Sequence, residues 1–236
     1  MLSVNNVTVS YGRTRVLKDF SASASDGEIA GLLGPNGSGK TTLLRFISGL
    51  LKADAGSIVY HGAEIDTTSR FWRSVLSYVP DDGGTIPILT VEEQLLLRCR
   101  LSGVSQNESV ERVKYIIHLL QIGGFKNSRS SELSTGLKKK LGIGLGIIGN
   151  AKTYLFDEPF ASLDLQAVEI AYGILIALKK SGAITVVATN SIPLQAEIWD
   201  RFWNLSDTNG TKTDKISIPE TLDAGQVILP WLSTSA

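Results

Sequence analysis

The chain has 236 residues, 43% of them hydrophobic, and its 23 lysines and arginines balance its 23 aspartates and glutamates. A chain of this length forms one large domain or two small ones, and it can bury a core without metals or disulfides. The balanced charge gives no global electrostatic reason to expect a nucleic acid or an anionic membrane surface as a partner. The single cysteine, Cys99, excludes an intrachain disulfide framework and agrees with a reducing compartment, so we expect a cytosolic location.

Nothing in the sequence predicts a membrane-spanning segment or a signal peptide. Residues 1–12 have neither a basic stretch nor an unbroken apolar stretch. The most apolar segments, at 141–148 and 174–178, are much shorter than the ~18 apolar residues that a spanning helix needs. We therefore expect that the chain does not cross a membrane by itself.

In chain order, the first third of the sequence alternates strands with turns. Val7, Val9 and Tyr11 recur at period two, which predicts a half-buried strand over residues 2–11 that ends at Gly12. Short apolar or β-prone runs indicate further strands at 28–33, 57–60 and 75–79. The run at 28–33 leads into a glycine-rich loop and then into a helical pattern, which is the order strand, loop, helix.

The middle of the chain turns helical, and strand signals return after it. Apolar residues recur every three to four positions at 108–122, and the whole stretch 91–149 has little β signal, so we expect a helical insert. Strand-like runs at 153–156 and 184–188 flank a helical segment at 165–180. This alternation predicts a parallel sheet with helical crossovers. The last thirty residues or so are polar and contain breakers, and we expect no appended regulatory domain, no internal repeat and no low-complexity tract.

A phosphate-binding loop is the strongest motif. Residues 34–41, GPNGSGKT, match G-x-x-x-x-G-K-[ST] and have the required strand before them and helix after them. Glycines let backbone N–H groups converge on phosphate oxygens at a helix N-terminus, Lys40 reaches the β- and γ-phosphates, and Thr41 offers a hydroxyl to Mg²⁺. The alternative is a glycine-rich turn with an incidental lysine. The predicted nucleotide contacts here are Gly34, Pro35, Asn36, Gly37, Ser38, Gly39, Lys40, Thr41 and Thr42.

A pair of acids supplies the rest of the predicted metal site. Asp157 and Glu158 end an apolar strand, at the sheet edge where open α/β folds bind ligands. We expect Asp157 to face the Mg²⁺ shell and Glu158 the attacking water. Paired acids at a strand end can also be mere solvated residues, but a phosphate loop upstream favours the catalytic interpretation.

The segment just upstream of the acids resembles a family signature. Residues 132–140 read ELSTGLKKK and resemble the LSGGQ signature of ABC ATPases, the nucleotide-binding subunits of ABC transporters. The resemblance covers nearly the whole chain. Tyr11 matches the aromatic residue that stacks on adenine, SLD at 162–164 matches the D-loop with Asp164, and VPD at 79–81 matches the Q-loop. Ser134 and Gly136 open a helix whose N–H groups can meet a γ-phosphate, and Ser134 can equally be only a helix cap.

This resemblance implies a fold, cofactors and partners. The expected fold is an α/β, RecA-like P-loop NTPase core (residues 1–85 and 150–236) with an N-terminal antiparallel β subdomain and a helical signature subdomain (residues 86–149), all in one ABC ATPase domain. The implied cofactors are ATP and Mg²⁺. The implied partners are a second ATPase subunit, in a homodimer or a heterodimer, and integral membrane permease subunits on separate chains, at the cytoplasmic face of the membrane; no nucleic acid is implied.

The sequence departs from the family pattern at three places. The signature carries Thr135 and Leu137 in place of glycine and glutamine. The Q-loop glutamine, which would join the metal site, is Asp81. The switch histidine is replaced by Asn190, which we interpret as a catalytic residue of a slow enzyme or, alternatively, as a turn residue before a helix that starts after Pro193.

Three functions compete at this point. The first is ATP hydrolysis that drives transport, with export favoured over import by the acidic Q-loop and the LSTGL signature. The second is a nucleotide-switched binding module in which hydrolysis only resets ATP-driven dimerisation, and Asn190 favours it. The third, an ABC protein acting on DNA or ribosomes, lacks the usual second ATPase unit, coiled coils or basic arms. We expect the surface at 81–102 to dock a membrane partner through Leu89, Val91, Leu95 and Leu96, although the last two fit core packing equally well.

Overall fold

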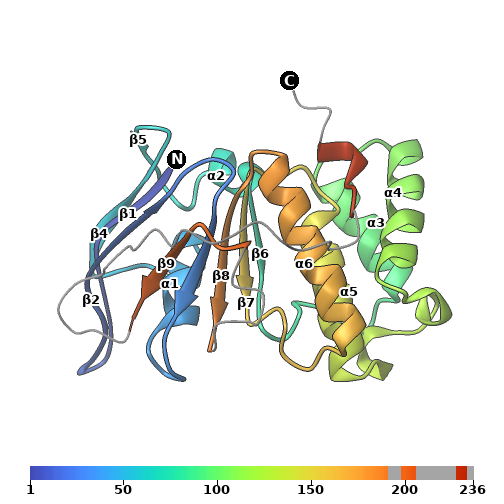
Figure 1. Ribbon diagram of the computed structural model, residues 1–236, viewed down its shortest axis with the longest axis horizontal. Helices are drawn as coiled ribbons and strands as arrows, with labels where there is room; N and C mark the ends of the chain where they lie inside the picture. The colour runs from blue at the N-terminus through green and yellow to red at the C-terminus, as the bar shows by residue number, and fades with distance from the viewer. Residues whose placement is uncertain (191–197, 206–226, 233–236) are drawn as a thin grey trace.

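An antiparallel sheet forms one side of the molecule in this computed structural model, which describes residues 1–190, 198–205 and 227–232. Its strand order is β2-β1-β4-β5 (Figure 1), with bounds Thr14–Ala24, Leu2–Tyr11, Ala55–Tyr60 and Ala63–Glu64. Leu2 and Val4 are buried, and so are Val7 and Val9, because a register shift between Val4 and Val7 returns the second pair to the core face. The predicted strand at 2–11 is confirmed, and β2 was not among the expected strands.

A parallel sheet forms the centre of the molecule. Its strand order is β6-β7-β8-β3-β9, with bounds Leu76–Val79, Thr153–Asp157, Ile184–Thr189, Ile29–Leu33 and Arg201–Asn204. Along β7, Leu155 belongs to one buried cluster while Tyr154 and Phe156 belong to the other, so both faces of the sheet are covered. Strand β9 pairs with β3 in register Leu32 to Trp203. It has four residues, too few for a periodic signal, and the sequence analysis did not anticipate it.

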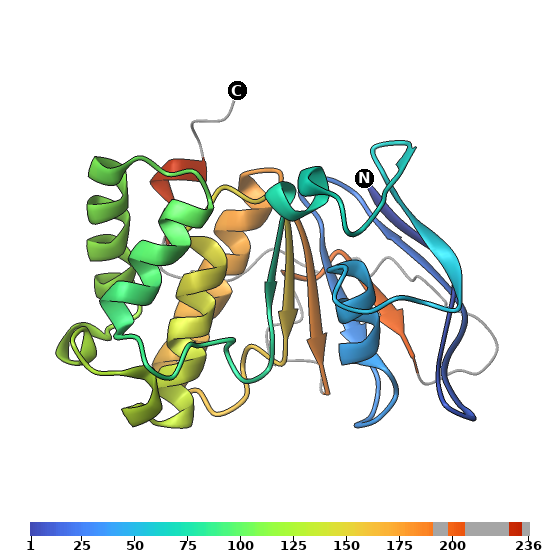
Figure 2. The same ribbon diagram turned by 180° about the vertical axis from the view of Figure 1, so that it is seen from behind.

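Helix α1 (Lys40–Ile47) lies between the two sheets (Figures 1 and 2). Leu43, Leu44 and Ile47 are fully buried in the cluster that joins the antiparallel sheet to the parallel strands. Helix α2 (Arg70–Val75) adds Trp72, whose Nε1–H donates to the carbonyl of Ile47 at 2.7 Å. Helix α6 (Leu165–Lys180) covers the opposite face of the parallel sheet.

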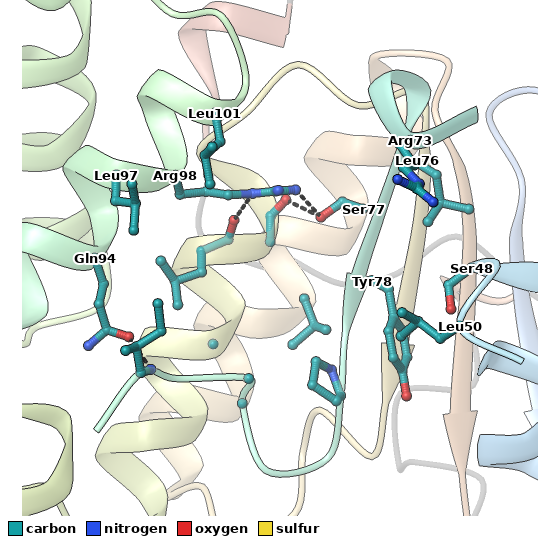
Figure 3. Close-up of a pocket in the computed structure, with 18 residues that line it drawn as sticks. Ser48, Leu50, Arg73, Leu76, Ser77, Tyr78, Gln94, Leu97, Arg98 and Leu101 are labelled. Carbon is teal, nitrogen blue, oxygen red and sulfur yellow. Dashed lines mark hydrogen bonds between the residues drawn. The ribbon is translucent and has the colours of Figure 1, made fainter. Parts of the chain in front are cut away.

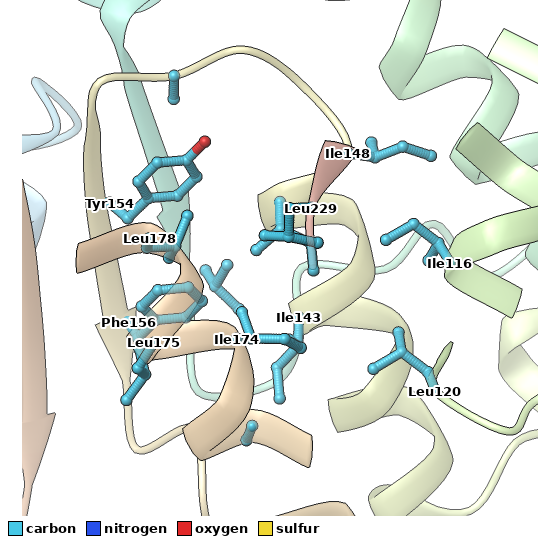
Figure 4. Packing of buried hydrophobic residues seen from close by; sticks show 14 of the residues in the cluster. Ile116, Leu120, Ile143, Ile148, Tyr154, Phe156, Ile174, Leu175, Leu178 and Leu229 are labelled. Atoms are coloured by element: carbon cyan, nitrogen blue, oxygen red, sulfur yellow. The ribbon is translucent and has the colours of Figure 1, made fainter. Parts of the chain in front are cut away.

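A helical layer stands beside α6, formed by α3 (Val91–Leu101), α4 (Gln106–Leu119) and α5 (Thr135–Ile147), with 3-10 turns at Gly123–Phe125 and Ser130–Glu132. Figure 4 shows Ile143 of α5 between Ile116 and Leu120 on one side and Phe156 and Ile174 on the other. The helical insert therefore shares one core with the parallel sheet. Each of the three helices begins at a hydroxyl residue that accepts a backbone N–H: Thr90, Ser105 and Ser134.

The last described segment packs on this helical layer. Pro230–Leu232 forms a short 3-10 turn, and Trp231 donates from Nε1 to the carbonyl of Ile147 at 3.1 Å. The ring of Tyr115 meets Trp231 edge to face. The helix expected after Pro193 and most of the polar tail lie outside the described residues. Within the described ranges, no helix combines the length and the apolar character needed to cross a bilayer.

Candidate nucleotide-binding and hydrolysis site

The glycine-rich loop joins β3 to α1 and ends at a left-handed residue. Gly39, the N-terminal cap of α1, has a φ of 102°. A Cβ at this position would lie 2.8 Å from the side chain of Leu17, so glycine is required both by the backbone and by the space. Ser38 Oγ is buried without a hydrogen-bond partner in the described part of the chain. The loop thus brings free polar groups and a helix N-terminus to one place, as an anion site needs.

Lys40 is buried and held by oxygen atoms. Its Nζ donates to the carbonyls of Gly34 at 2.7 Å and Pro35 at 3.3 Å and to Oδ1 of Asn190, and it lies 3.6 Å from Oε1 of Glu158. Only 6% of the residue is exposed. This buried ammonium group contacts neutral carbonyl oxygens and the carboxylate of Glu158. It can exchange these partners for phosphate oxygens.

Asp157 ends β7 beside the loop and is almost fully buried, with 1% exposed. The hydroxyl of Tyr78 donates to its Oδ2 at 3.4 Å, whereas Oδ1 has no hydrogen-bond partner among the described residues. Burial raises the pKa of Asp157, and the hydroxyl of Thr41 opposes this by hydrogen bonding. This carboxylate oxygen of Asp157, unpaired within the described chain, and the hydroxyl of Thr41 are oxygen ligands of the kind that Mg²⁺ prefers.

Glu158 follows directly and is held in an unusual backbone conformation. Its φ is +48°, in the left-handed region that non-glycine residues seldom adopt. Its N–H donates to the carbonyl of Ala188 at 2.9 Å, and its Oε2 accepts from the N–H of Asn190 at 3.3 Å. Burial raises the pKa of Glu158, and the ammonium group of Lys40 acts in the opposite direction. A carboxylate with a raised pKa in a cleft can act as a base toward water.

These residues surround a cleft of about 490 Å³, a volume within the usual range of ligand sites. Its lining consists of Val16, Asn36, Gly37, Gly39, Lys40, Thr41, Thr42, Asp81, Asp157, Glu158, Ala161 and Asn190. The structure therefore brings the predicted metal and catalytic residues together with six of the predicted phosphate-loop contacts, whereas Gly34, Pro35 and Ser38 are not in the described lining. Val16 and Ala161 were missed, because single apolar residues in loops and strands give no motif.

Tyr11, by contrast, is not part of this lining among the described residues. It ends β1 opposite Thr14, and its side chain is exposed, with 48% of the residue accessible. Asp81 reaches the cleft and pairs there with Lys139 of α5, whose Nζ lies 2.7 Å from its Oδ1. Lys139 is therefore a site neighbour that no sequence motif indicates. The available signal was a run of three lysines after the signature, and only the fold selects one of them.

The signature residues lie apart from the cleft of their own chain. Ser134 caps α5 by accepting the N–H of Leu137 at 3.3 Å. Gly136 packs closely on the next loop, since a Cβ there would lie 2.8 Å from the carbonyl of Ser162. Asp164 caps α6 and lies 3.3 Å from Nζ of Lys140. The described cleft lining contains none of the three predicted ligands Ser134, Gly136 and Asp164.

Comparison with known proteins agrees with this arrangement. The family model described as "ABC transporter" matches residues 17–161. An uncharacterized ABC transporter ATP-binding protein of Methanocaldococcus jannaschii is 29% identical over 96% of this chain and 85% of its own length. The Nod factor export ATP-binding protein I of Rhizobium etli is 30% identical over 85% of this chain, and the match spans 63% of that protein.

Solved structures share the whole fold. The ATP-binding subunit of an ABC transporter superposes with a TM-score of 0.83 at 25% identity, over 92% of this chain and 90% of that chain. A dimeric ATP-binding cassette in a post-hydrolysis state, bound to ADP and Pi, superposes with a TM-score of 0.80 at 25% identity, over 91% of this chain and 98% of that chain. The expected P-loop NTPase fold, with its antiparallel β subdomain and helical insert, is confirmed. The chain belongs to the ABC transporter ATP-binding protein family.

Proposed function

We propose that the chain is the ATP-hydrolysing subunit of an ABC transporter, with Mg²⁺ as cofactor and separate membrane subunits as partners. The observation that carries the proposal is the convergence of Lys40, Asp157 and Glu158 on one cleft at the end of the phosphate loop. Each of the three keeps a group that can interact with a ligand. The ammonium group of Lys40 is bound by loop carbonyls that phosphate can replace, Asp157 has a carboxylate oxygen without a described hydrogen-bond partner, and the pKa of Glu158 is raised.

The residues divide the chemistry among them. Lys40 leaves the loop carbonyls and Asn190 to neutralise the β- and γ-phosphates. Thr41 and Asp157 would hold Mg²⁺, which supplies charge neutralisation when it is bound, and Asp81 would be the further acidic residue at this site. Glu158 orients and deprotonates the attacking water, because its backbone and carboxylate are fixed between Ala188 and Asn190.

A second copy, or a paralogous subunit, completes the site. Ser134, Gly136 and Asp164 stand at or next to the N-termini of α5 and α6, away from the cleft of their own chain, so they are available to the γ-phosphate bound by another subunit. Tyr11 has an exposed ring that stacks on adenine at the rim. A similar ATP-binding cassette is dimeric in its post-hydrolysis state with ADP and Pi bound, which supports a second subunit as the partner.

The Glu158→Gln variant tests this proposal. The amide keeps the shape of the side chain but loses the base, so we expect turnover to fall by about 10² to 10⁴-fold while ATP binding persists. A stable dimer should then accumulate in the presence of ATP and Mg²⁺, measured by light scattering coupled to size exclusion. A chelator that removes Mg²⁺ should dissociate this dimer. Hydrolysis by the variant at the wild-type rate would show that Glu158 has another role.

The proposed docking site for the membrane subunit is a groove of about 430 Å³ between α3, α5 and β6. Figure 3 shows Leu97, Arg98 and Leu101 of α3 on one side and Tyr78 of β6 on the other. Val91 and Leu95, which we expected to supply apolar contacts here, are fully buried in the core instead, and Leu96 packs against it. Leu97 and Leu101 take this place because they lie on the opposite face of the same helix.

Assembly with the membrane subunit tests the groove. Leu101, with 72% exposed, lines it, so Leu101→Asp should reduce the membrane chain that co-purifies from detergent-solubilised membranes. Val110→Asp on α4, at a position 42% exposed and outside the groove, is the matched control. Equal recovery with both variants would place the partner elsewhere. We propose peripheral attachment at the cytoplasmic face and export as the direction of transport, which substrate flux into or out of vesicles reconstituted with the recovered membrane chain would measure.

Asn190 favours a second candidate, a slow ABC ATPase that acts mainly as a nucleotide-switched binding module. Its Oδ1 accepts a hydrogen bond from Lys40, a contact that supports a role for this side chain next to the proposed phosphate site. His61 lies in the turn after β4 and His118 within α4, and neither lines the described part of the cleft.

Single-turnover hydrolysis at saturating ATP separates the two candidates. Losing one preorganised donor costs about 10² to 10³ in rate, so Asn190→His should be faster than wild type and Asn190→Ala slower. The partial compensation by the amide places the expected gain near the low end of that range. Three equal rates would leave Asn190 as a turn residue.

A further inference from the structure

Lys139 is a buried cation that the proposed chemistry does not use. It lies on α5, five residues after Ser134, and only 3% of it is exposed. Its neighbours Lys138 and Lys140 are partly exposed, and Lys140 pairs with Asp164 at the start of α6. Burying an ammonium group is costly unless its hydrogen bonds are satisfied, so its partners define what the residue does.

Those partners belong to two separate segments. Nζ donates to the main-chain carbonyl and to Oδ1 of Asp81, the latter at 2.7 Å, and to the main-chain carbonyl of Glu158 at 2.9 Å. An ammonium group has three donors, and all three are used here. Lys139 therefore joins the signature helix, the loop after β6 and the residue after β7 at a single atom.

The contact with Glu158 matters because this residue is strained. A φ of +48° for glutamate persists only where the surroundings hold it. The N–H of Glu158 is fixed by Ala188 and its carbonyl by Lys139, so both flanking peptide groups are anchored. The direction of its carboxylate, toward Lys40 and Asn190, follows from this backbone conformation.

The contact with Asp81 is supported by close backbone packing. A Cβ on Gly142 of α5 would lie 2.5 Å from Cα of Gly83, and one on Gly83 would lie 2.6 Å from the carbonyl of Lys138. The loop of residues 80–84 is thus seated directly on α5. The side chain of Asp81 is 66% exposed and that of Lys139 only 3%, so water reaches the carboxylate end of this pair while the ammonium group stays buried.

From this geometry we propose that Lys139 is a positioning residue for hydrolysis. It holds the main chain of Glu158 at a fixed position relative to Asp81 and to α5, the helix that begins at the signature residue Ser134. The inference rests on the proposed function. If it holds, a movement of α5 also moves the main chain of Glu158, the proposed base. Because Lys139 is not among the residues that line the described cleft, its loss should alter the orientation of Glu158 more than the affinity for nucleotide.

The test compares Lys139→Met, which keeps the aliphatic stem, with Lys139→Arg and with Lys138→Met as a matched control one residue away. Displacement of a catalytic group by about 1 Å can cost about 10²-fold in rate, so we expect kcat for ATP in Lys139→Met to fall by about 10- to 100-fold. The Kd for a fluorescent ATP analogue should change by less than about threefold, since charge contacts to phosphate remain. Lys139→Arg should recover most of kcat, and Lys138→Met should match the wild type.

Two results would overturn the inference while leaving the proposed function intact. One is an unchanged kcat in Lys139→Met. The other is a decrease of kcat, nucleotide affinity and melting temperature together, which is expected if Lys139 only stabilises the fold. A wild-type protein without any ATP hydrolysis would instead overturn the proposed function and this inference with it.

Discussion

Two lysine–carboxylate pairs lie in very different surroundings, and the contrast separates the two halves of the proposed site. In the cleft, Lys40 and Glu158 are 3.6 Å apart, with 7% and 19% of their side chains exposed. At the signature end, Lys140 and Asp164 are 3.3 Å apart, but 63% of the Asp164 side chain is exposed. The first pair is shielded from solvent within one chain, whereas the second stands on an open face.

This difference is what we expect if, as proposed, two chains share the site. Electrostatic interactions are stronger where water is excluded, so under the proposed function the cleft of one chain would bind phosphate before a second chain is added. An exposed pair contributes little to stability, and the open helix N-termini of α5 and α6 gain strength only when another surface covers them. Substitutions in the cleft and at the signature face should therefore have separable effects.

The largest expected effect is loss of nucleotide binding in Lys40→Ala. Removing one partner of a desolvated, hydrogen-bonded charge pair costs about 2–5 kcal/mol of binding free energy, and here the partner left behind is a polyphosphate. Isothermal titration calorimetry with ATP and Mg²⁺ measures it, with Lys52→Ala, an exposed lysine, as the control. If Lys40→Ala binds ATP as tightly as Lys52→Ala, the phosphate loop is not the binding site.

A smaller effect is expected at the signature face, where Ser134→Ala and Ser105→Ala form a matched pair. Both serines cap a helix, accepting the N–H of Leu137 at 3.3 Å and of Glu108 at 3.4 Å. Each variant should lose about 0.5–2 kcal/mol of unfolding free energy. Only Ser134→Ala should also lose steady-state ATPase activity, by about tenfold or more, because a hydrogen bond to a charged group contributes about 1.5–3 kcal/mol.

Thermal unfolding and ATPase assays on the two serine variants decide this point. Equal losses of activity in both would mean that Ser134 acts only as a helix cap. ATP affinity of the isolated chain should be unchanged in both, which distinguishes the signature face from the cleft.

The last expected effect is on stability alone and concerns the hydrogen bonds at the start of β3, the strand that leads into the phosphate loop. Glu28, before β3, accepts from the N–H of Ser25 at 2.6 Å and from the guanidinium of Arg201 on β9. Burial by itself acts to raise the pKa of Glu28, but these hydrogen bonds outweigh it and the pKa is lowered. The stabilisation is therefore present above the ordinary pKa of glutamate and is lost as the pH falls through the lowered value.

Urea unfolding at neutral pH and near pH 3 tests that sign. Glu28→Gln should lose about 1–3 kcal/mol at neutral pH and less in acid, whereas Glu64→Gln, at an exposed position of β5, should change little at either pH. A constant deficit at both pH values would mean that packing, not charge, is the contribution of Glu28.

Motifs with local geometry were predictable from sequence, and contacts between distant segments were not. The phosphate loop and the acid pair are contiguous stretches between regular elements, so their neighbourhood follows from the order strand, loop, helix. Lys139 meets Asp81 and Glu158 across 58 and 19 positions of the chain, and no periodicity encodes such a meeting.

The remaining misses have the same cause. The sequence allowed both core packing and docking for Leu95 and Leu96, and the structure buries Leu95 in the core and packs Leu96 against it. Val91, expected only at the docking surface, is also fully buried. Strands β2 and β9 went unpredicted because β2 bends through register shifts against β1 and β9 is short. Both become strands through the partners they pair with, which tertiary structure supplies.

The most direct test of the account mixes two inactive variants. Lys40→Ala removes the lysine of the phosphate loop, and Ser134→Glu places a carboxylate at the signature end. We expect that a homodimer of either variant has no complete site. A mixed dimer pairs the intact loop of one chain with the intact signature of the other. If the sites are shared in this way, an equimolar mixture should regain about one quarter of the wild-type ATPase rate, since half of the dimers are mixed and each holds one complete site. A mixture no more active than the mean of its two components would contradict the claim that a second chain completes the cleft.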